Sequence, residues 1–430
     1  LDWRCGLYVD ALDKTFHLEE GSKLIVFATS NPSSNGGIYE LNQDLKSRFA
    51  IWTWDYPDIK NEMSMVNSSE IPYRFSKGIF RSGIQVSPKN IFPSNIQGLP
   101  TWFEVRVNEK GYLGRREGID ISVVMNPQSY RDDVKELKSG GYLIYDSSWK
   151  RDFGRDDINV LGIPLTQLCV NEFSNPKQRL LFKNLGYVGV LASILGMDKE
   201  IYISLINEQF KGKEKLIEPN IKALEIGYSY AEENFKDLCE IKVNKSNKTD
   251  GLILTSGNDA AGLGCVYGGA TFCAWYPITP STSLAESFSD YSEKLRKEDE
   301  SQKNKFAFIQ AEDELAAIGM TIGANWNGAR GFTATSGPGI SLMSEFIGLA
   351  YFAEVPSVIF NVQRGGPSTG MPTRTQQSDL LACAYASHGD TKHVLLIPSD
   401  PKECFDFSIE AFDLADRLQT PVIVLSDLDL

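Results

Sequence analysis

Four short segments in the C-terminal part of the chain carry residue types that could bind and activate an anionic ligand. Residues 276–282 read YPITPST, and the two prolines fix the backbone around the hydroxyl of Thr279. Residues 311–320 read AEDELAAIGM, residues 333–339 read TATSGPG, and residues 362–373 read VQRGGPSTGMPT. Hydroxyl, carboxylate and guanidinium groups beside glycine-rich turns are suited to a ligand that bears a carboxylate.

The first segment predicts a turn followed by a helix, with Ser281 or Thr282 as the N-cap. Unpaired N–H groups at a helix start favour an anion, so a carboxylate beside Thr279 is physically reasonable. A well-capped turn without any ligand accounts for the same residues. Both interpretations stay open at this level.

The second segment places three acids, Glu312, Asp313 and Glu314, at a predicted helix start, where the helix dipole stabilises negative charge. That effect alone could explain them. Glu314, however, precedes small residues that permit close packing, so a ligand could approach it. A buried glutamate there could hydrogen-bond a heterocycle nitrogen and shift its tautomer.

The other two segments are glycine-rich turns. Gly337 and Gly339 flank Pro338 and permit a ligand to approach the backbone closely. The turn fits neither the Walker A pattern nor the dinucleotide fingerprint. Arg364 follows an apolar run in a glycine-rich loop, a position that suits bidentate binding of a carboxylate.

Apolar runs that could position these segments recur from residue 251 to the end of the chain. They are apolar throughout rather than alternating, which is typical of parallel strands buried on both faces. Helix-length stretches, Asp313–Trp326 and Cys404–Leu418, lie between them. We therefore predict a doubly wound α/β sheet whose loops converge at one edge. The predicted strands are Leu252–Thr255, Phe306–Gln310, Phe332–Thr335, Ser357–Val362, Val394–Ile397 and Val422–Leu425.

Residues 66–235 predict a second, smaller α/β unit, and the polar segment 236–250 predicts a linker to the domain over 251–430. The predicted elements of the smaller unit are strands at Ile121–Met125 and Tyr142–Tyr145 and helices at Arg131–Lys138, Gln178–Leu195 and Lys213–Phe235.

Composition excludes several classes of protein. The net charge of −13 argues against nucleic acid as a partner. Seven scattered cysteines without a C-x-x-C pair argue against a disulfide framework or a complete iron–sulfur site, and they fit a reducing cytoplasm. Apolar runs stay below about 18 residues, so we expect no membrane span. The chain begins with Leu1 rather than Met, so we expect a fragment or a processed product.

In their order and spacing, the four segments resemble the signature segments of 2-oxoacid:ferredoxin oxidoreductase alpha subunits. They read YPITPST, AEDELAAIGM, TATSGPGISLM and QRGGPSTGMPTRTQQSDL, and the resemblance covers about residues 250–430. It implies a domain that binds the pyrimidine end of thiamine diphosphate, with Glu314 on the aminopyrimidine and Glu312 as the alternative acid. Tyr276 and Pro280 would line the cofactor.

The same resemblance implies that Thr279, Arg364 and Thr373 contact a 2-oxoacid, mainly its carboxylate. His388, in the sequence SHGD, also matches a family segment. A loop histidine held by hydrogen bonds explains His388 at least as well.

Upstream, the sequence resembles the gamma domain that this family fuses ahead of the alpha part. The matching segments are NIFPSNIQGLPTW at 90–102, GYLGRR at 111–116 and DSS at 146–148. The family associates this domain with coenzyme A access and assembly; a purely structural module is the alternative. Residues 64–72 lack the glycines of the family's opening strand and turn, so we expect both to be missing.

Residues 1–65 have a different character. Residues 26–32, 39–41 and 45–49 resemble the sensor strand and arginine-finger helix of MoxR-type AAA+ ATPases, with Asn31 as the sensor and Arg48 as the finger. A strand over 23–28 and a helix over 41–49 are predicted. No Walker A loop precedes them, so we expect no complete ATP site. A fusion relic or an assembly artefact is the alternative.

The family's metal motif, Gly-Asp-Gly followed by Asn, has no match, because Gly389-Asp390 is followed by Thr391. The resemblance places that motif, its Mg²⁺ and a [4Fe-4S] cluster on a separate beta subunit, so we predict no metal site here and half an active site. The chain also stops at Leu430, before a further family domain, so we expect it to be truncated.

The predicted reaction is oxidative decarboxylation of a 2-oxoacid to an acyl-CoA, with electrons passed to ferredoxin. The PSTGMPT loop around Thr373 favours 2-oxoglutarate. A truncated relic without activity, or an indolepyruvate- or pyruvate-type member of the superfamily, is the alternative.

Overall fold

The computed structural model describes the backbone of residues 6–9 and 14–17, and residues 71–91, 101–108, 110–111, 114, 117–125, 129–297, 301 and 303–430. The chain divides into two units, Leu1–Glu62 and Met63–Leu430. In the first unit, β1 (Gly6–Val9) pairs with β2 (Lys14–His17) in antiparallel fashion. The elements predicted at 23–28 and 41–49, Asn31, Arg48, and residues 64–70 lie outside the described residues.

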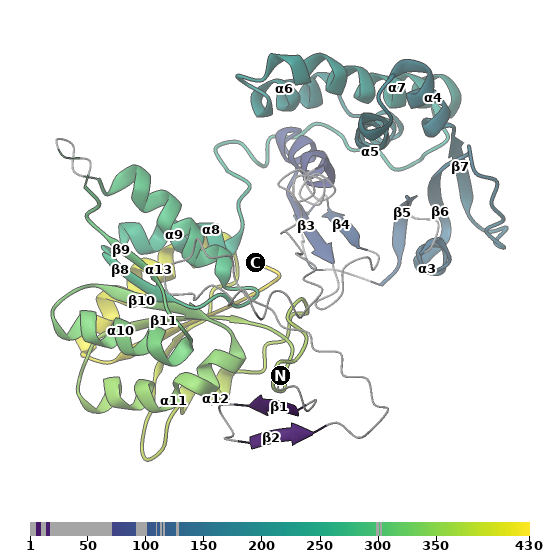
Figure 1. Cartoon of the computed structure of the whole chain (residues 1–430). Coiled ribbons are helices and arrows are strands. Elements are labelled where there is room, and N and C mark those ends of the chain that lie inside the picture. Colours follow the sequence, from purple (N-terminus) through teal and green to yellow (C-terminus); the bar gives the residue numbers. More distant parts are fainter. Residues whose placement is uncertain are drawn as a thin grey trace. The chain divides into compact units, whose positions relative to one another are not determined.

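The C-terminal part of the second unit is built on a six-stranded sheet of order β12-β13-β11-β10-β8-β9 (Figure 1). Every pairing in this sheet is parallel. The central strands β10, β11 and β13 are buried along their whole length. The predicted α/β parallel sheet is therefore confirmed. The strands are β8 (Phe272–Trp275), β9 (Ala307–Gln310), β10 (Gly331–Thr335), β11 (Ser357–Gln363), β12 (Val394–Leu396) and β13 (Pro421–Asp427).

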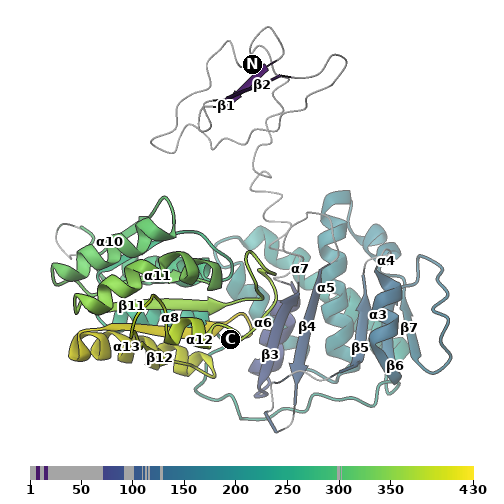
Figure 2. The same cartoon turned by 90° about the horizontal axis from the view of Figure 1, so that it is seen from below.

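Helices cover both faces of this sheet (Figures 1 and 2). Residues of β11 alternate between two hydrophobic cores: Val358 and Phe360 pack in one, and Ile359 packs in the other. The first core is closed by α8 (Gly257–Tyr267), α9 (Thr282–Leu295) and α13 (Pro401–Leu418). The second is closed by α10 (Glu314–Trp326), α11 (Gly337–Phe352) and α12 (Leu380–Ala384).

Five of the six predicted strands and both predicted helices of this part are confirmed. The strand predicted at Leu252–Thr255 is wrong: the segment has no regular structure, and Ile253 is 80% exposed. Helix α8 was not predicted, because it is rich in glycine and its helix propensity is low. Close packing explains the glycines, because a Cβ on Gly264 would lie 2.5 Å from the carbonyl oxygen of Phe405 in α13.

The upstream part has its own sheets and its own hydrophobic core. Strands β5 (Ile119–Val124), β6 (Leu137–Asp146) and β7 (Asn159–Ile163) pair in parallel, and β3 (Val86–Ile91) pairs with β4 (Trp102–Val107) in antiparallel fashion. Both strands and all three helices predicted here are confirmed, while β3, β4, β7, α4 and α6 were missed. The helices are residues 71–81, α3 (Tyr130–Glu136), α4 (Leu165–Glu172), α5 (Pro176–Ile194), α6 (Lys199–Gln209) and α7 (Ile217–Phe235), which follows a short 3₁₀ turn at Glu214–Leu216.

The polar segment 236–250 contains no helix or strand, yet its backbone is held against the upstream part. Val243 N–H donates to Leu195 O at 2.9 Å, and Ser246 N–H donates to Ser82 O at 2.8 Å. These backbone hydrogen bonds satisfy N–H and C=O groups of the segment although it forms no helix or strand. Within the described helices, none is both long and apolar enough to cross a bilayer.

A matched pair of glycine substitutions tests the packing of α8. Gly264→Ala places a methyl group against the backbone of α13, so we expect it to destabilise the fold by about 1–3 kcal/mol, as overpacking does. Gly323→Ala in α10 meets nothing within 4 Å and should be neutral or stabilise by about 1 kcal/mol. Thermal unfolding of both variants measures the difference; equal midpoints would contradict the packing.

Candidate functional site

The four predicted segments leave neighbouring strands at the same edge of the sheet. Residues 276–281 follow β8, residues 311–313 follow β9, Ser336 follows β10, and residues 364–379 follow β11. In space these strands are consecutive, in the order β11-β10-β8-β9. Because all are parallel, their carboxyl ends point the same way, and the loops converge on one edge, where open α/β sheets hold ligands.

Arg364 joins two of these loops. Its side chain is only 6% exposed, and its terminal nitrogens each donate one hydrogen bond of 2.8 Å, Nη1 to Thr279 O and Nη2 to Thr369 O. Its Nε is buried and has no hydrogen-bond partner within the described part of the chain. Burial lowers the pKa of the guanidinium, and the negative charge of Glu314 partly opposes this shift. A desolvated cation with a free donor is a strong attractor for a carboxylate.

Thr279 and Thr373 differ in what they offer. Thr279 uses its carbonyl to hold Arg364, while the residue as a whole stays exposed, and its peptide bond to Pro280 is cis. Thr373 is buried, and Nη1 of Arg374 donates to its carbonyl at 3.0 Å and to its Oγ1 at 3.2 Å. The loop closes on itself through Gly365 N–H, which donates to Arg374 O at 2.7 Å. Both threonines therefore belong to the loops that frame Arg364.

The three acids after β9 take three different positions. Glu312 is exposed, and Asp313 caps α10 by accepting from Ala316 N–H at 2.7 Å. Glu314 is the first residue of α10 and is only 9% exposed. In the described part of the chain, no group donates a hydrogen bond to its carboxylate. Asp313 thus satisfies the helix start, and Glu314 is left with no structural function of that kind.

The glycine turn after β10 packs directly against Glu314. A Cβ on Gly339 would lie 3.1 Å from Cγ of Glu314 and 1.9 Å from Oγ1 of Thr335. Glycine is therefore required at this position for α11 to begin so close to the acid.

The loop after β8 completes this edge of the sheet. Pro280 is buried and Tyr276 is half-buried. Ser281 occupies the N-cap position of α9, as predicted, but makes no capping bond; its hydroxyl donates to Ile278 O at 3.1 Å. His388 lies outside these loops: it is exposed, with Nδ1 at 3.7 Å from Oε2 of Glu345.

Three polar residues at this edge were not predicted as site residues: Asn361, Gln363 and Asp379. Asn361 is fully buried in β11, and its Nδ2 donates to Oδ2 of Asp379 at 3.0 Å. Gln363 is also buried and accepts from Asp379 N–H at 3.3 Å. An amide inside the otherwise apolar strand at 357–362 is the signal that could have identified Asn361.

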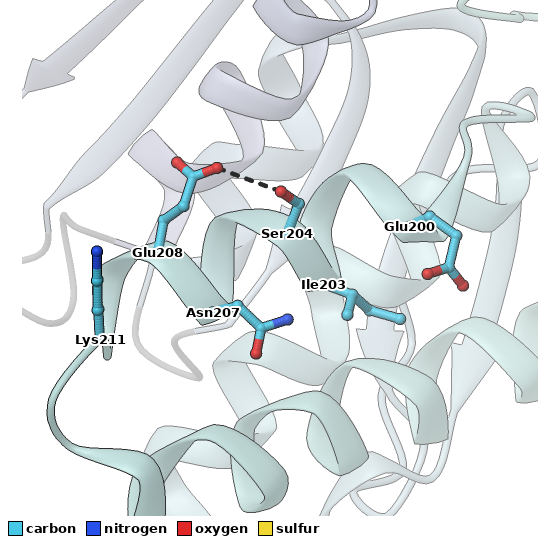
Figure 3. Close-up of a pocket in the computed structure, with 6 residues that line it drawn as sticks. All are labelled: Glu200, Ile203, Ser204, Asn207, Glu208 and Lys211. Atoms are coloured by element: carbon cyan, nitrogen blue, oxygen red, sulfur yellow. Dashed lines mark hydrogen bonds between the residues drawn. The ribbon is translucent and has the colours of Figure 1, made fainter.

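A hollow of about 400 Å³ lies elsewhere, on α6 of the upstream part (Figure 3). Its lining is an ordinary polar helix surface, where Ser204 Oγ donates to Oε1 of Glu208 at 3.2 Å. Glu208 is already paired with Arg81 at 2.8 Å. Apart from Ile203, the lining residues are exposed to solvent, so the carboxyl edge of the larger sheet, with its buried charged groups, is the better candidate site. The lining residues are Glu200, Ile203, Ser204, Asn207, Glu208 and Lys211.

Two family models match the chain, one on each part. Residues 263–429 match "Pyruvate flavodoxin/ferredoxin oxidoreductase, thiamine diP-bdg", and residues 74–230 match "Pyruvate ferredoxin/flavodoxin oxidoreductase".

Curated relatives and a solved structure agree with these matches. Subunit alpha of 2-oxoacid:ferredoxin oxidoreductase 2 from Aeropyrum pernix is 30% identical over 82% of this chain and 62% of its own length. The 2-oxoglutarate synthase subunit KorA of Methanothermobacter thermautotrophicus is 49% identical over 40% of this chain and 43% of its own. The chain thus spans roughly half the length of these relatives.

The solved structure is the 2-oxoglutarate:ferredoxin oxidoreductase of Magnetococcus marinus, with 2-oxoglutarate, coenzyme A and succinyl-CoA bound. It aligns with a TM-score of 0.76 at 30% identity, over 84% of this chain and 61% of its own. The resemblance of residues 1–65 to AAA+ ATPases stays a prediction. Two family models in order, and relatives that extend across both parts, show that this chain belongs to the alpha-subunit family of 2-oxoacid:ferredoxin oxidoreductases.

Proposed function

We propose that this chain is the alpha-type subunit of a thiamine-dependent 2-oxoacid:ferredoxin oxidoreductase that acts on 2-oxoglutarate and contributes half of the active site. The observation that carries the proposal is that a buried acid, Glu314, and a buried cation, Arg364, both follow strands at the same edge of the sheet. An acid suits a heterocycle nitrogen, and a guanidinium suits the carboxylate of the substrate.

The residues around Glu314 fit the aminopyrimidine of thiamine diphosphate. A buried carboxylate without a donor from the described chain calls for a ligand group that carries a proton. Gly339 lets the start of α11 pack against Glu314, and Tyr276 and Pro280 are proposed to line the ring. When bound, thiamine diphosphate supplies the nucleophilic carbon and accepts the electrons of decarboxylation. The task of Glu314 is to hold a proton at a ring nitrogen.

Arg364 is proposed to bind the carboxylate next to the substrate's oxo group. Its terminal nitrogens are fixed by Thr279 O and Thr369 O, so the guanidinium plane is set before substrate arrives. Its Nε–H has no hydrogen-bond partner among the described residues, so we propose it as a further donor to the carboxylate. Together with Thr279 and Thr373, it would orient the oxo carbon, which is how binding energy is converted into rate. The names of KorA relatives support 2-oxoglutarate as the substrate.

The other half of the site is proposed to come from a beta-type subunit that carries Mg²⁺, the diphosphate motif and a [4Fe-4S] cluster, with ferredoxin as the electron acceptor. Helices α10, α11 and α12 cover one face of the sheet (Figure 1). These helices expose large apolar side chains. The side chain of Phe352 is 89% exposed. Leaving so much apolar surface in water is unfavourable, so we expect a partner to cover it. The exposed apolar residues on these helices include Leu315, Met320, Leu342, Phe352 and Leu381.

The upstream part is proposed to be the gamma-type domain, over 66–235, joined by 236–250 to the thiamine domain at 251–430. A role in coenzyme A access remains part of this proposal. Asp146 of the DSS segment accepts from Ser148 N–H at 3.1 Å and Thr166 N–H at 3.2 Å, so it ties the turn after β6 to α4. That contact supports the structural alternative for this segment. The cytoplasmic location is proposed on the scattered cysteines alone.

Replacing Glu314 with Gln removes the proposed proton carrier without changing side-chain volume. In a pair with a beta-type subunit, we expect Glu314→Gln to lower 2-oxoglutarate-dependent dye reduction by at least about 100-fold, since such proton transfer is worth 10²–10⁴. Glu312→Gln, on the exposed neighbour, is the matched control and should keep near-normal activity. Full activity of Glu314→Gln, or loss of activity only in Glu312→Gln, would reject the assignment.

Arg364→Lys keeps a positive charge but loses the two guanidinium nitrogens that donate to Thr279 O and Thr369 O. We expect KM for 2-oxoglutarate to rise about 10- to 100-fold, the size of one lost charge-assisted hydrogen bond, while KM for coenzyme A stays unchanged. Arg417→Lys, on the exposed end of α13, serves as the control. An unchanged KM for the 2-oxoacid would remove Arg364 from the substrate site.

A further inference from the structure

Asp379 ends the loop that begins at Arg364, and its carboxylate returns to the core of the sheet. Oδ2 accepts from Nδ2 of Asn361 at 3.0 Å, and the backbone N–H donates to Oε1 of Gln363 at 3.3 Å. Asn361 and Gln363 are both buried in β11, the strand that leads into the loop. The two ends of the loop are therefore fastened to the same strand, the second one through this carboxylate.

Asn361 donates two hydrogen bonds through Nδ2, one to Oδ2 of Asp379 at 3.0 Å and one to Sγ of Cys383 at 3.4 Å. Because sulfur is a weak acceptor, the bond to Asp379 is the stronger of the two. Asn361 is fully buried in a strand that is otherwise apolar from Val358 to Val362, and its Oδ1 has no hydrogen-bond partner among the described residues. A buried amide that is only partly satisfied destabilises a core. Its one strong hydrogen bond goes to Asp379, which indicates that the fold tolerates the amide for that contact.

The same carboxylate lies against the first residue of α11. A Cβ on Gly337 would fall 2.8 Å from Oδ2 of Asp379, so the carboxylate is in contact with the glycine. The helix start has no acid in its first turn, and Ser336 makes no capping bond. A carboxylate is stabilising at the positive end of a helix, so Asp379 supplies from another loop what the local sequence lacks.

This contact connects the two halves of the candidate site. The first turn of α11 touches the loop through Gly337 and Asp379, and it touches Glu314 through Gly339. At the other end of the loop, Arg364 reaches the β8 loop through Thr279. The proposed cofactor acid and the proposed substrate loop thus share one rigid element, the first turn of α11.

We propose that Asp379 is a positioning residue that locks the loop over 364–379 onto α11, and so fixes Arg364 and Thr373 relative to Glu314. It acts through these residues and touches neither cofactor nor substrate. The consequence for substrate binding rests on the proposed function; the locking of the loop does not.

Hydrogen–deuterium exchange on the full chain, paired with a beta-type subunit, tests the lock directly. Asp379→Asn removes the charge at α11 with little change in shape, and Asp390→Asn makes the same change at an exposed aspartate of the same domain. We expect exchange in peptides over 364–379 to become about tenfold faster in Asp379→Asn, as loss of one charge-assisted contact predicts, and to stay unchanged in Asp390→Asn. Asn361→Leu, which removes the donor but keeps the number and branching of the side-chain heavy atoms, should open the loop to a similar extent.

Steady-state kinetics separates positioning from general weakening of the fold. For Asp379→Asn, KM for 2-oxoglutarate should rise about tenfold, in step with the exchange, while KM for coenzyme A stays within about twofold. Loop exchange equal to that of Asp390→Asn, or no effect of Asn361→Leu, overturns the inference whatever the activity. If Asp379→Asn exchanges faster in the loop but the wild-type pair turns over no 2-oxoacid, the lock is supported and the proposed function is overturned.

Discussion

The buried guanidinium of Arg364 is the interaction on which the rest of the site depends. Removing a cation from water is expensive, and the fold compensates with two carbonyl oxygens at 2.8 Å, one from its own loop and one from the loop after β8. Those bonds draw two loops together that are 85 residues apart in the sequence. We propose that the Nε–H, which has no hydrogen-bond partner among the described residues, serves to recognise the ligand.

Strand order converts separate motifs into one site. The four segments are spread over about 100 residues, but the strands before them are neighbours in the order β11-β10-β8-β9. Burial of β10 and β11 on both faces holds their ends rigidly, and the edge strand β9 places Glu314 at the border of the sheet. Such rigid support from strands is what a preorganised site requires.

The sequence predicts those parts of the fold whose signal is local. Apolar runs such as Ser357–Val362 are strands because both of their faces are buried, and Glu314 could be preferred over Glu312 because small residues follow it. Helix α8 escaped detection because its glycines are stabilised by contacts with α9 and α13, which no local pattern records. The strand predicted at Leu252–Thr255 failed because an apolar run without a neighbouring strand has nothing to pair with. The contact between Asn361 and Asp379 depends on how a loop returns to its strand, which is a tertiary property.

The central claim is that this chain provides the pyrimidine-side and carboxylate-side half of a shared site. The direct measurement is viologen-dye reduction that depends on both 2-oxoglutarate and coenzyme A, made on the wild-type chain alone and after co-expression with a beta-type subunit. The account predicts no turnover by the chain alone and turnover by the pair, lost when either substrate is omitted. Turnover by the chain alone would contradict it. So would a stable pair that fails to reduce the dye with any 2-oxoacid.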